Sequence, residues 1–184
     1  MAKELNIHKQ YAYWSEKQLQ LVLINADNLL NIKENINDKN LHRTIQNILE
    51  KKLNFTTLPL SRARDTTIQK LSKLTCRTLS GMKETMALHP RKDLTAITVK
   101  LDGEYIGWSL VHLINESEAY IQIFVKQKYR GLKIGSNLLY AAQKYAKRKD
   151  KNTILVSPRN KTGEKFFVKY NFYKKSEEFY LKNI

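Results

Sequence analysis

A short glycine-containing segment, Arg130 to Gly135, constrains the fold of this chain more than any other feature. The residues before it, 119–125, alternate between two sets of side chains with period two, as in a β-strand. The residues after it place apolar side chains at helical spacing, at Leu138, Leu139, Ala142, Tyr145 and Ala146. The backbone N–H groups in the first turn of such a helix have no partner within the helix, and the helix dipole adds positive potential there. The pattern therefore predicts an anion site, for which a pyrophosphate is the natural occupant.

Strand and helix patterns flank this segment on both sides. Upstream, strands are expected over 94–101, 104–113 and 118–125, the first two joined by the two-residue turn Asp102-Gly103. Before them, 55–60 can form a first strand. Asp65 is expected to cap a helix that runs to about Ser80 and is ended by Gly81. Downstream, we expect a short strand over 153–157, a helix over 162–170 and a closing hairpin over 172–181.

Two motifs in this region resemble signatures of the GNAT superfamily of N-acetyltransferases. Arg130 to Gly135 resembles the acyl-CoA signature Arg/Gln-x-x-Gly-x-Gly/Ala, with Lys133 in place of the central glycine. A left-handed backbone at a lysine costs roughly 1 kcal/mol. Asn160 to Phe172 resembles the second signature, Asn-x-x-Ala-x-x-Phe-Tyr-x-x-x-Gly-Phe. There, Gly163 replaces alanine, Asn171 replaces glycine and Phe167 replaces tyrosine.

The resemblance implies an α/β (α+β) fold with a GNAT-like, mixed and mostly antiparallel central sheet flanked by helices. Residues 55–184 would form this domain, and 1–54 a helical N-terminal extension. The implied activity is that of an acetyl-CoA-dependent N-acetyltransferase, in which a primary amine attacks the acyl group directly in a ternary complex. The residues expected to bind acetyl-CoA, or another acyl-CoA, are Ile123, Phe124, Val125, Arg130, Gly131, Leu132, Lys133, Ile134, Gly135, Ser136, Asn160 and Phe167.

The catalytic groups are less evident than the CoA loop. In many family members, the tyrosine found where this chain has Phe167 protonates the leaving CoA thiolate, and a phenyl ring has no proton to give. Tyr170 is a candidate acid, with an ordinary half-buried aromatic as the alternative. Glu118 is the candidate base, because the family often keeps its base on this strand; the alternative is a solvated carboxylate in a polar turn. A degenerate GNAT-like protein that binds nucleic acid or protein without catalysis is a second interpretation of the chain.

The N-terminal 54 residues carry two apolar helical stripes, one at 19–30 and one at 41–53, separated by a polar stretch. This pattern predicts a helical hairpin. Its apolar faces need a cover, which the catalytic domain, the other helix or a second copy of the chain would supply. A homodimer through the N-terminal helices is therefore one expected arrangement.

Composition limits the other function classes. The single cysteine, Cys76, and the lack of a histidine–cysteine cluster exclude a disulfide framework and predict no metal site. No signal peptide or membrane-spanning stretch is found in the sequence, so we expect a cytoplasmic protein that does not enter a membrane.

The formal net charge of +16 is placed unevenly. Residues 55–184 hold 25 basic and 11 acidic residues, more positive charge than CoA requires. This surplus predicts contact with DNA, RNA or a nucleic-acid-bound protein, with charge that serves only solubility as the alternative. A nucleic-acid-binding protein that never binds CoA would need a recognised reading motif, and the sequence has none.

Overall fold

The computed structural model describes residues 39–74 and 81–184, with only the backbone of 39–42, 44–46 and 81–84. The apolar stripe predicted at 19–30, the part of the predicted helix over 75–80, and Cys76 lie outside these residues. No helix in the described part of the chain is long and apolar enough to span a membrane.

The centre of the fold is a seven-stranded sheet with the order β1-β2-β3-β4-β5-β7-β6. Its pairs are antiparallel except β4 with β5, which run parallel. This confirms the mixed, mostly antiparallel sheet expected from the sequence. The strands are β1 (Asn54–Pro59), β2 (Leu94–Leu101), β3 (Glu104–Leu113), β4 (Glu118–Val125), β5 (Thr153–Val156), β6 (Tyr173–Lys174) and β7 (Tyr180–Asn183).

The turn between β2 and β3 has the conformation that its sequence predicts. Asp102 and Gly103 both have positive φ, 47° and 85°, as a two-residue hairpin turn of the primed type requires. This turn places Leu101 opposite Glu104, and the register then continues, with one irregularity at Val99/Lys100, to His112 opposite Leu94. The bounds predicted for β2, β3 and β4 agree with the structure.

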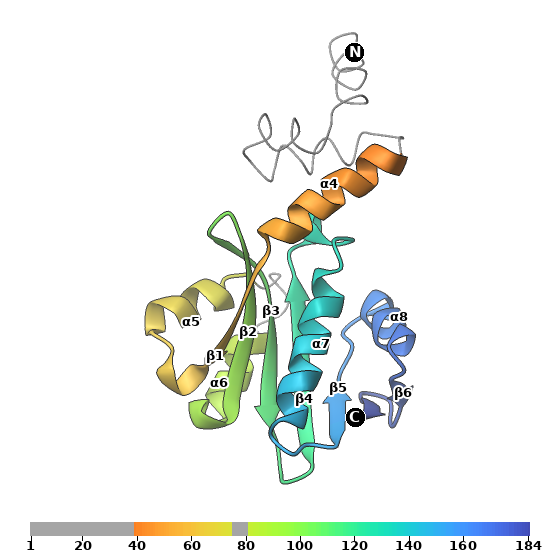
Figure 1. The fold of residues 1–184 in the computed structure, drawn as a ribbon. Helices are drawn as coiled ribbons and strands as arrows, with labels where there is room; N and C mark the ends of the chain where they lie inside the picture. The colour runs from red at the N-terminus through yellow and green to blue at the C-terminus, as the bar shows by residue number, and fades with distance from the viewer. Residues whose placement is uncertain (1–38, 75–80) are drawn as a thin grey trace.

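Helices cover both faces of the sheet (Figure 1). The helices α5 (Asp65–Ser72) and α6 (Gly81–Leu88) lie on one side of β2 and β3, and α7 (Ile134–Lys147) lies on the other. The α5 side has a core of Leu60, Leu71, Leu94, Ala96, Trp108 and Leu110. The larger core under α7 includes Ile48 and Leu49 of α4 (Lys39–Lys52), so the second predicted apolar stripe packs at least partly onto the sheet domain.

The strands β4 and β5 pair for only three residues and then part. Glu118, Ala119 and Tyr120 pair with Thr153, Ile154 and Leu155, whereas β4 continues beside β3 as far as Val125. β5 ends at Val156, and Pro158, which has no N–H to donate, precedes α8 (Lys161–Lys169). From Ile121 onward, β4 therefore has a sheet partner on one side only.

Two predictions about helix ends are wrong. Arg64, not Asp65, is the N-cap of α5, and no side-chain hydrogen bond caps that helix. The Asp65 carboxylate instead accepts a hydrogen bond from Arg91 Nη1 at 2.8 Å, although its place in the first turn still suits the helix dipole. Gly81 is the first residue of α6 rather than the end of the preceding helix.

Gly107 provides a direct test of how tightly β3 and β4 pack. A Cβ at this position would lie 2.7 Å from the Phe124 carbonyl oxygen, closer than such atoms can approach, and 3.2 Å from Val99 Cγ1, which is a tight contact. We expect Gly107→Ala to lower the free energy of unfolding by about 1–3 kcal/mol in a urea titration. Gly163→Ala is the control: its Cβ would meet only contacts of 3.6 Å or longer, and in a helix the change should be neutral or stabilising by up to about 1 kcal/mol. Equal effects of the two variants would contradict this account of the strand contact.

Candidate acyl-CoA site

The loop between β4 and α7 has the backbone that an anion cradle needs. It begins with a short 3₁₀ turn, η3 (Gln127–Tyr129), and ends where α7 starts at Ile134. Gly131 and Lys133 both have positive φ, 83° and 55°. Nothing lies within 4 Å of where a Cβ of Gly131 would be, so this point of the loop is open to a ligand. The N–H groups of Ile134, Gly135 and Ser136, in the first turn of α7, have no carbonyl partner within the helix.

Lys133 takes the left-handed conformation that the glycine of the family signature would adopt without strain. It is the N-cap residue of α7, with φ 55° and ψ 10°. Its Nζ lies 3.5 Å from Glu50 Oε1, an ion pair at the surface that contributes little stability. A lysine held in this conformation keeps the backbone geometry of the loop and adds a cation beside it.

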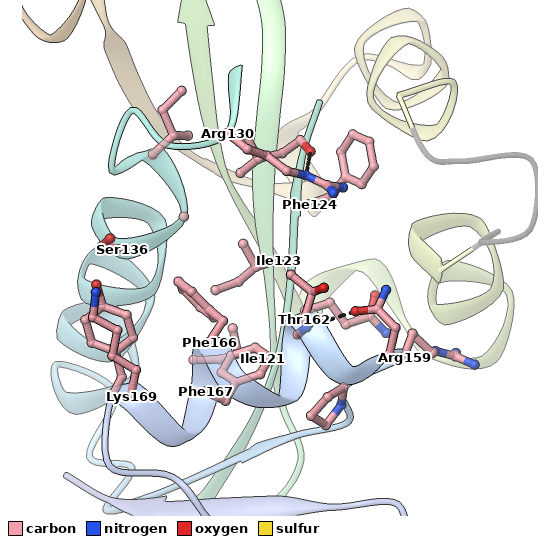
Figure 2. A pocket seen from close by; sticks show the side chains of 18 of the residues that line it. Ile121, Ile123, Phe124, Arg130, Ser136, Arg159, Thr162, Phe166, Phe167 and Lys169 are labelled. Atoms are coloured by element: carbon pink, nitrogen blue, oxygen red, sulfur yellow. Dashed lines mark hydrogen bonds between the residues drawn. The ribbon is translucent and has the colours of Figure 1, made fainter. Parts of the chain in front are cut away.

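A cavity of about 650 Å³ opens beside this loop, where β4 and β5 part (Figure 2). Residues of β4, the loop, the first turn of α7, the β5–α8 connection and α8 line it. Its cations are Arg130, Lys133, Arg159 and Lys169, and its described lining contains no aspartate, glutamate or histidine. The electrostatic potential of the cavity therefore favours a negatively charged ligand.

The structure brings together eleven of the twelve residues that the sequence assigned to acyl-CoA: Ile123, Phe124, Val125, Arg130, Gly131, Lys133, Ile134, Gly135, Ser136, Asn160 and Phe167 line the cavity. Leu132 does not, because its side chain is fully buried in the core beneath the loop.

The hydrogen-bonding pattern between β3 and β4 shows which backbone N–H and C=O groups of β4 face the gap. Lys126 N–H donates to the carbonyl of Ile106 on β3 at 2.9 Å. Antiparallel partners alternate between hydrogen-bonded and non-bonded pairs, so Phe124 and Gln122 also direct their backbone groups at β3. Ile123 and Val125 then direct theirs away from β3, toward the gap. Arg130 Nε donates to the Val125 carbonyl at 3.2 Å, which agrees with a carbonyl that points away from β3.

Side chains from both faces of the sheet line the cavity. In Figure 2, Phe124 and Arg159 lie toward α5 and α6, whereas Ser136 and Lys169 lie toward α7 and the far end of α8. Because side chains alternate along a strand, Gln122 and Phe124 belong to one face of β4, and Ile121 and Ile123 to the other. The lining of the cavity therefore includes side chains from both faces of the sheet.

Aromatic rings from α8 form the apolar wall of the cavity. Phe167 is 7% exposed, and its ring centroid lies 5.2 Å from that of Phe166 and 5.3 Å from that of Phe172, both edge to face. Tyr170, the candidate acid, also lines the cavity, half-buried, with its ring 5.1 Å from Phe166. Among the hydroxyl-bearing residues of the cavity lining, Tyr170 is the nearest in sequence to Phe167, which has no hydroxyl group.

Asn160 has a structural role in the described site. Its Oδ1 accepts a hydrogen bond from the backbone N–H of Gly163 at 2.9 Å and so caps α8. Asn171 has φ 65°, the left-handed conformation expected of a residue in place of the signature glycine.

The structure does not bring Glu118 to the cavity. This residue lies at the start of β4, opposite Thr153, where β4 and β5 still pair. Its carboxylate accepts a hydrogen bond from Asn115 Nδ2 at 2.8 Å and lies 3.8 Å from Lys175 Nζ. Both contacts are those of a surface turn, so the assignment of Glu118 as general base finds no support in this geometry.

Two buried polar side chains in the cavity wall were not predicted as site residues. Trp108 of β3 and Gln122 of β4 line the cavity, and Trp108 Nε1 and Gln122 Oε1 are buried without a hydrogen-bond partner. Arg159 and Lys169 were also missed. Register between β3 and β4 would have revealed Trp108, but the four-residue connection between these strands does not fix that register from sequence alone.

Two titratable groups outside the cavity have shifted pKa values. Burial lowers the pKa of His112, with a further lowering from His89, whose ring centroid is 3.9 Å away; Asp93 opposes both. The Tyr180 hydroxyl donates to Glu164, and this hydrogen bond, more than burial, raises the pKa of Tyr180. Neither residue lines the cavity, so these shifts concern β3 and the contact of β7 with α8.

Solved structures share this fold at low sequence identity. Ard1 from Thermoplasma volcanium is 14% identical, with a TM-score of 0.55 over 72% of this chain and 98% of that chain. The PaiA N-acetyltransferase from Thermoplasma acidophilum, solved in complex with coenzyme A, is 18% identical, with a TM-score of 0.53 over 72% of this chain and 99% of that chain. The GNAT domain of S. lividans PAT is 14% identical, with a TM-score of 0.56 over 72% and 90% of the respective chains.

The sequence gives the family independently of these structural likenesses. No curated protein matches it. A family model described as the acetyltransferase (GNAT) family matches residues 67–172, more than half of the chain and the whole of the loop and its flanking elements. The chain belongs to the GNAT family of acetyltransferases.

Proposed function

We propose that this protein is an acetyl-CoA-dependent N-acetyltransferase that acts on a primary amine by direct attack in a ternary complex. The observation that carries the proposal is the cavity at the parting of β4 and β5, which joins an anion cradle to the free edge of a strand. In CoA the pantetheine arm is attached to the pyrophosphate. The anion cradle suits the pyrophosphate, and the free strand edge that adjoins it suits the pantetheine arm.

The residues present fit acyl-CoA. The N–H groups of 131–136, together with Arg130 and Lys133, are placed to hold the pyrophosphate. The backbone groups of Ile123 and the N–H of Val125 are placed to pair with the amides of the pantetheine arm, as a further strand would. Phe166 and Phe167 give the thioester end of the cavity an apolar wall.

The reaction forms one N–C bond and breaks one C–S bond. The amine lone pair attacks the thioester carbonyl carbon, the thiolate leaves, and the nitrogen loses one proton while the sulfur gains one. Phe167 cannot supply that proton, and Tyr170 is the hydroxyl-bearing residue beside it in the cavity lining. We propose water as the group that takes the proton of the nitrogen, because the described lining has amide and hydroxyl groups but no carboxylate or imidazole.

We place the acceptor on the α5 side of the sheet, the face opposite α7 and the phosphate loop. Arg62, Arg64, Lys70 and Lys73 are exposed on and around α5, and this basic surface supports an acceptor associated with nucleic acid. None of them lines the cavity, so their charge is not needed for CoA. A nucleic-acid acceptor would cross this surface to reach the part of the cavity nearest α5 and α6.

A catalytically degenerate GNAT protein is the alternative, and Phe167 favours it. Without a hydroxyl at this position, such a protein would bind acyl-CoA and a partner but would not release the thiol at a useful rate. The two functions differ in turnover, not in CoA binding.

Acetyl-CoA should bind and stabilise the protein. At a hundredfold excess over Kd, binding to the folded state alone adds about 2.7 kcal/mol to the free energy of unfolding. Gly135→Pro removes one N–H donor from the cradle and should lose most of this effect, while circular dichroism checks that the fold is kept. A melting temperature of the wild type that millimolar acetyl-CoA leaves unchanged would refute acyl-CoA-dependent transfer.

Phe167→Tyr separates the enzyme from its degenerate alternative. If loss of the acid limits turnover, restoring a hydroxyl at this 7%-exposed position should raise kcat, by up to about 10²-fold, with little change in acetyl-CoA affinity. Tyr170→Phe should then cost less in the Phe167→Tyr background than in the wild type, because the new hydroxyl takes over its role. The measurement is release of free CoA thiol with the acceptor in excess; a large drop in kcat on Phe167→Tyr would show that the site needs an apolar ring.

The basic surface around α5 should bind a polyanion. We expect affinity for duplex DNA to fall linearly with salt on a log–log plot, with a slope of roughly 0.9 per phosphate neutralised. Replacing Arg62, Arg64, Lys70 and Lys73 by glutamine should flatten that slope and leave acetyl-CoA binding intact. The matched control replaces four exposed cations at the end of α7, namely Lys144, Lys147, Arg148 and Lys149. Equal slopes for the two quadruple variants would mean that only total charge matters and that the acceptor is a small molecule or a protein amine.

A further inference from the structure

Trp108 and Gln122 each carry a buried polar atom without a partner, and both line the same cavity. Trp108 is only 3% exposed, and its Nε1 donates no hydrogen bond. Gln122 Oε1 is likewise buried and accepts none. Leaving such an atom unpaired is unfavourable, so buried polar atoms in native proteins are almost always satisfied. A ligand that pairs with both atoms would recover this cost.

The two side chains lie next to each other on one face of the sheet. Trp108 is opposite Phe124 on β4, and Gln122 is opposite Leu110 on β3. Directly opposite residues share a face, and Trp108 and Leu110 belong to the core on the α5 side. Trp108 and Gln122 are thus diagonal neighbours on the face that α5 and α6 cover, the acceptor side of the cavity.

A hydrogen bond ties the Gln122 amide to α6. Gln122 Nε2 donates to Thr85 Oγ1 at 3.0 Å, which leaves the carbonyl oxygen as the end without a partner. Trp108 can only donate, through its indole N–H. The residues of the cavity wall therefore include one indole donor and one amide acceptor that have no partner.

We propose that Trp108 and Gln122 form the acceptor subsite of this enzyme and select an amine whose nitrogen lies three bonds from a hydrogen-bond-accepting oxygen. The inference rests on the proposed N-acetyltransferase function. Gln122 Oε1 accepts one N–H of the neutral amine, and Trp108 Nε1–H donates to the neighbouring oxygen. Two contacts orient the nitrogen, whose lone pair is then available to attack the thioester carbon. Both are positioning residues, because neither takes up a proton in the step.

The subsite discriminates through its unpaired atoms. An amine without the neighbouring oxygen leaves the Trp108 N–H buried and unsatisfied, and such a mismatch rejects an analogue more strongly than a missing methylene does. The subsite therefore prefers amines with a hydrogen-bond-accepting oxygen nearby, whatever the rest of the acceptor molecule is.

The test compares two probe amines: alaninamide, whose carbonyl oxygen lies three bonds from the amine nitrogen, and isopropylamine, in which a methyl group replaces the carboxamide. We expect the wild type to prefer alaninamide in kcat/KM, and Trp108→Phe or Gln122→Met to reduce that preference about tenfold. The difference in amine pKa between the probes is the same for every variant and cancels in the comparison. Gln143→Met is the matched control: Gln143 on α7 also has a buried, unpaired amide nitrogen but does not line the cavity, and its preference should equal that of the wild type.

A second readout does not depend on turnover. The chain has two tryptophans, Trp14 and Trp108, so Trp14→Phe leaves Trp108 as the sole indole fluorophore. With CoA present, alaninamide should shift its emission saturably as the indole N–H gains a partner, and Gln122→Met should abolish the shift even if Trp108→Phe fails to fold. No emission shift and no probe preference, with acetyl-CoA binding intact, would overturn the subsite and leave the proposed function standing. If the wild-type protein does not bind acetyl-CoA, the proposed function itself is refuted.

Discussion

The parting of β4 from β5 after Tyr120 and Leu155 is the constraint on which the rest of the site depends. A strand that loses its neighbour in the middle of a sheet exposes backbone donors and acceptors that must be paired. In this fold, the chain leaves β5 through Pro158 and enters α8, which covers the apolar side of the gap and leaves the backbone edge of β4 open. The cavity is therefore a consequence of strand topology, and the side chains around it adjust its chemistry.

The two faces of the sheet divide the work of the proposed reaction. On the α7 face, the loop and the first helical turn supply backbone donors and cations suited to the phosphates of CoA. On the α5 face, Trp108 and Gln122 supply side-chain contacts at a buried wall, beneath a surface rich in Arg and Lys. The thioester of a bound donor would lie between them, in the gap, where one side delivers the donor and the other the amine.

Much of the fold could be predicted from the sequence because its signals are local. Asp102-Gly103 specifies a hairpin turn, period-two alternation marks β4, and helical spacing marks α7, all as the structure has them. The loop residues followed from the motif, except that Leu132 turns its side chain into the core. Lys133 shows that a motif position can keep its backbone conformation after its residue has changed.

What the sequence could not provide depends on contacts between distant segments. Trp108 and Gln122 come together only through the β3–β4 register, and Gln122 is hydrogen-bonded to Thr85, 37 residues away. Asp65 has the composition of an N-cap, yet its carboxylate bonds Arg91 from another part of the chain. Glu118 was chosen for its strand, but the pairing of that end of β4 with β5 keeps it outside the cavity.

Amide hydrogen exchange of β4, read residue by residue by NMR, tests the central claim most directly. If the free edge of β4 holds the donor, saturating acetyl-CoA should slow exchange at Ile123 and Val125, whose N–H groups face the gap. Gln122 and Phe124, already bonded to β3, serve as internal controls and should change little. Binding of acetyl-CoA that leaves Ile123 and Val125 unprotected would contradict the account.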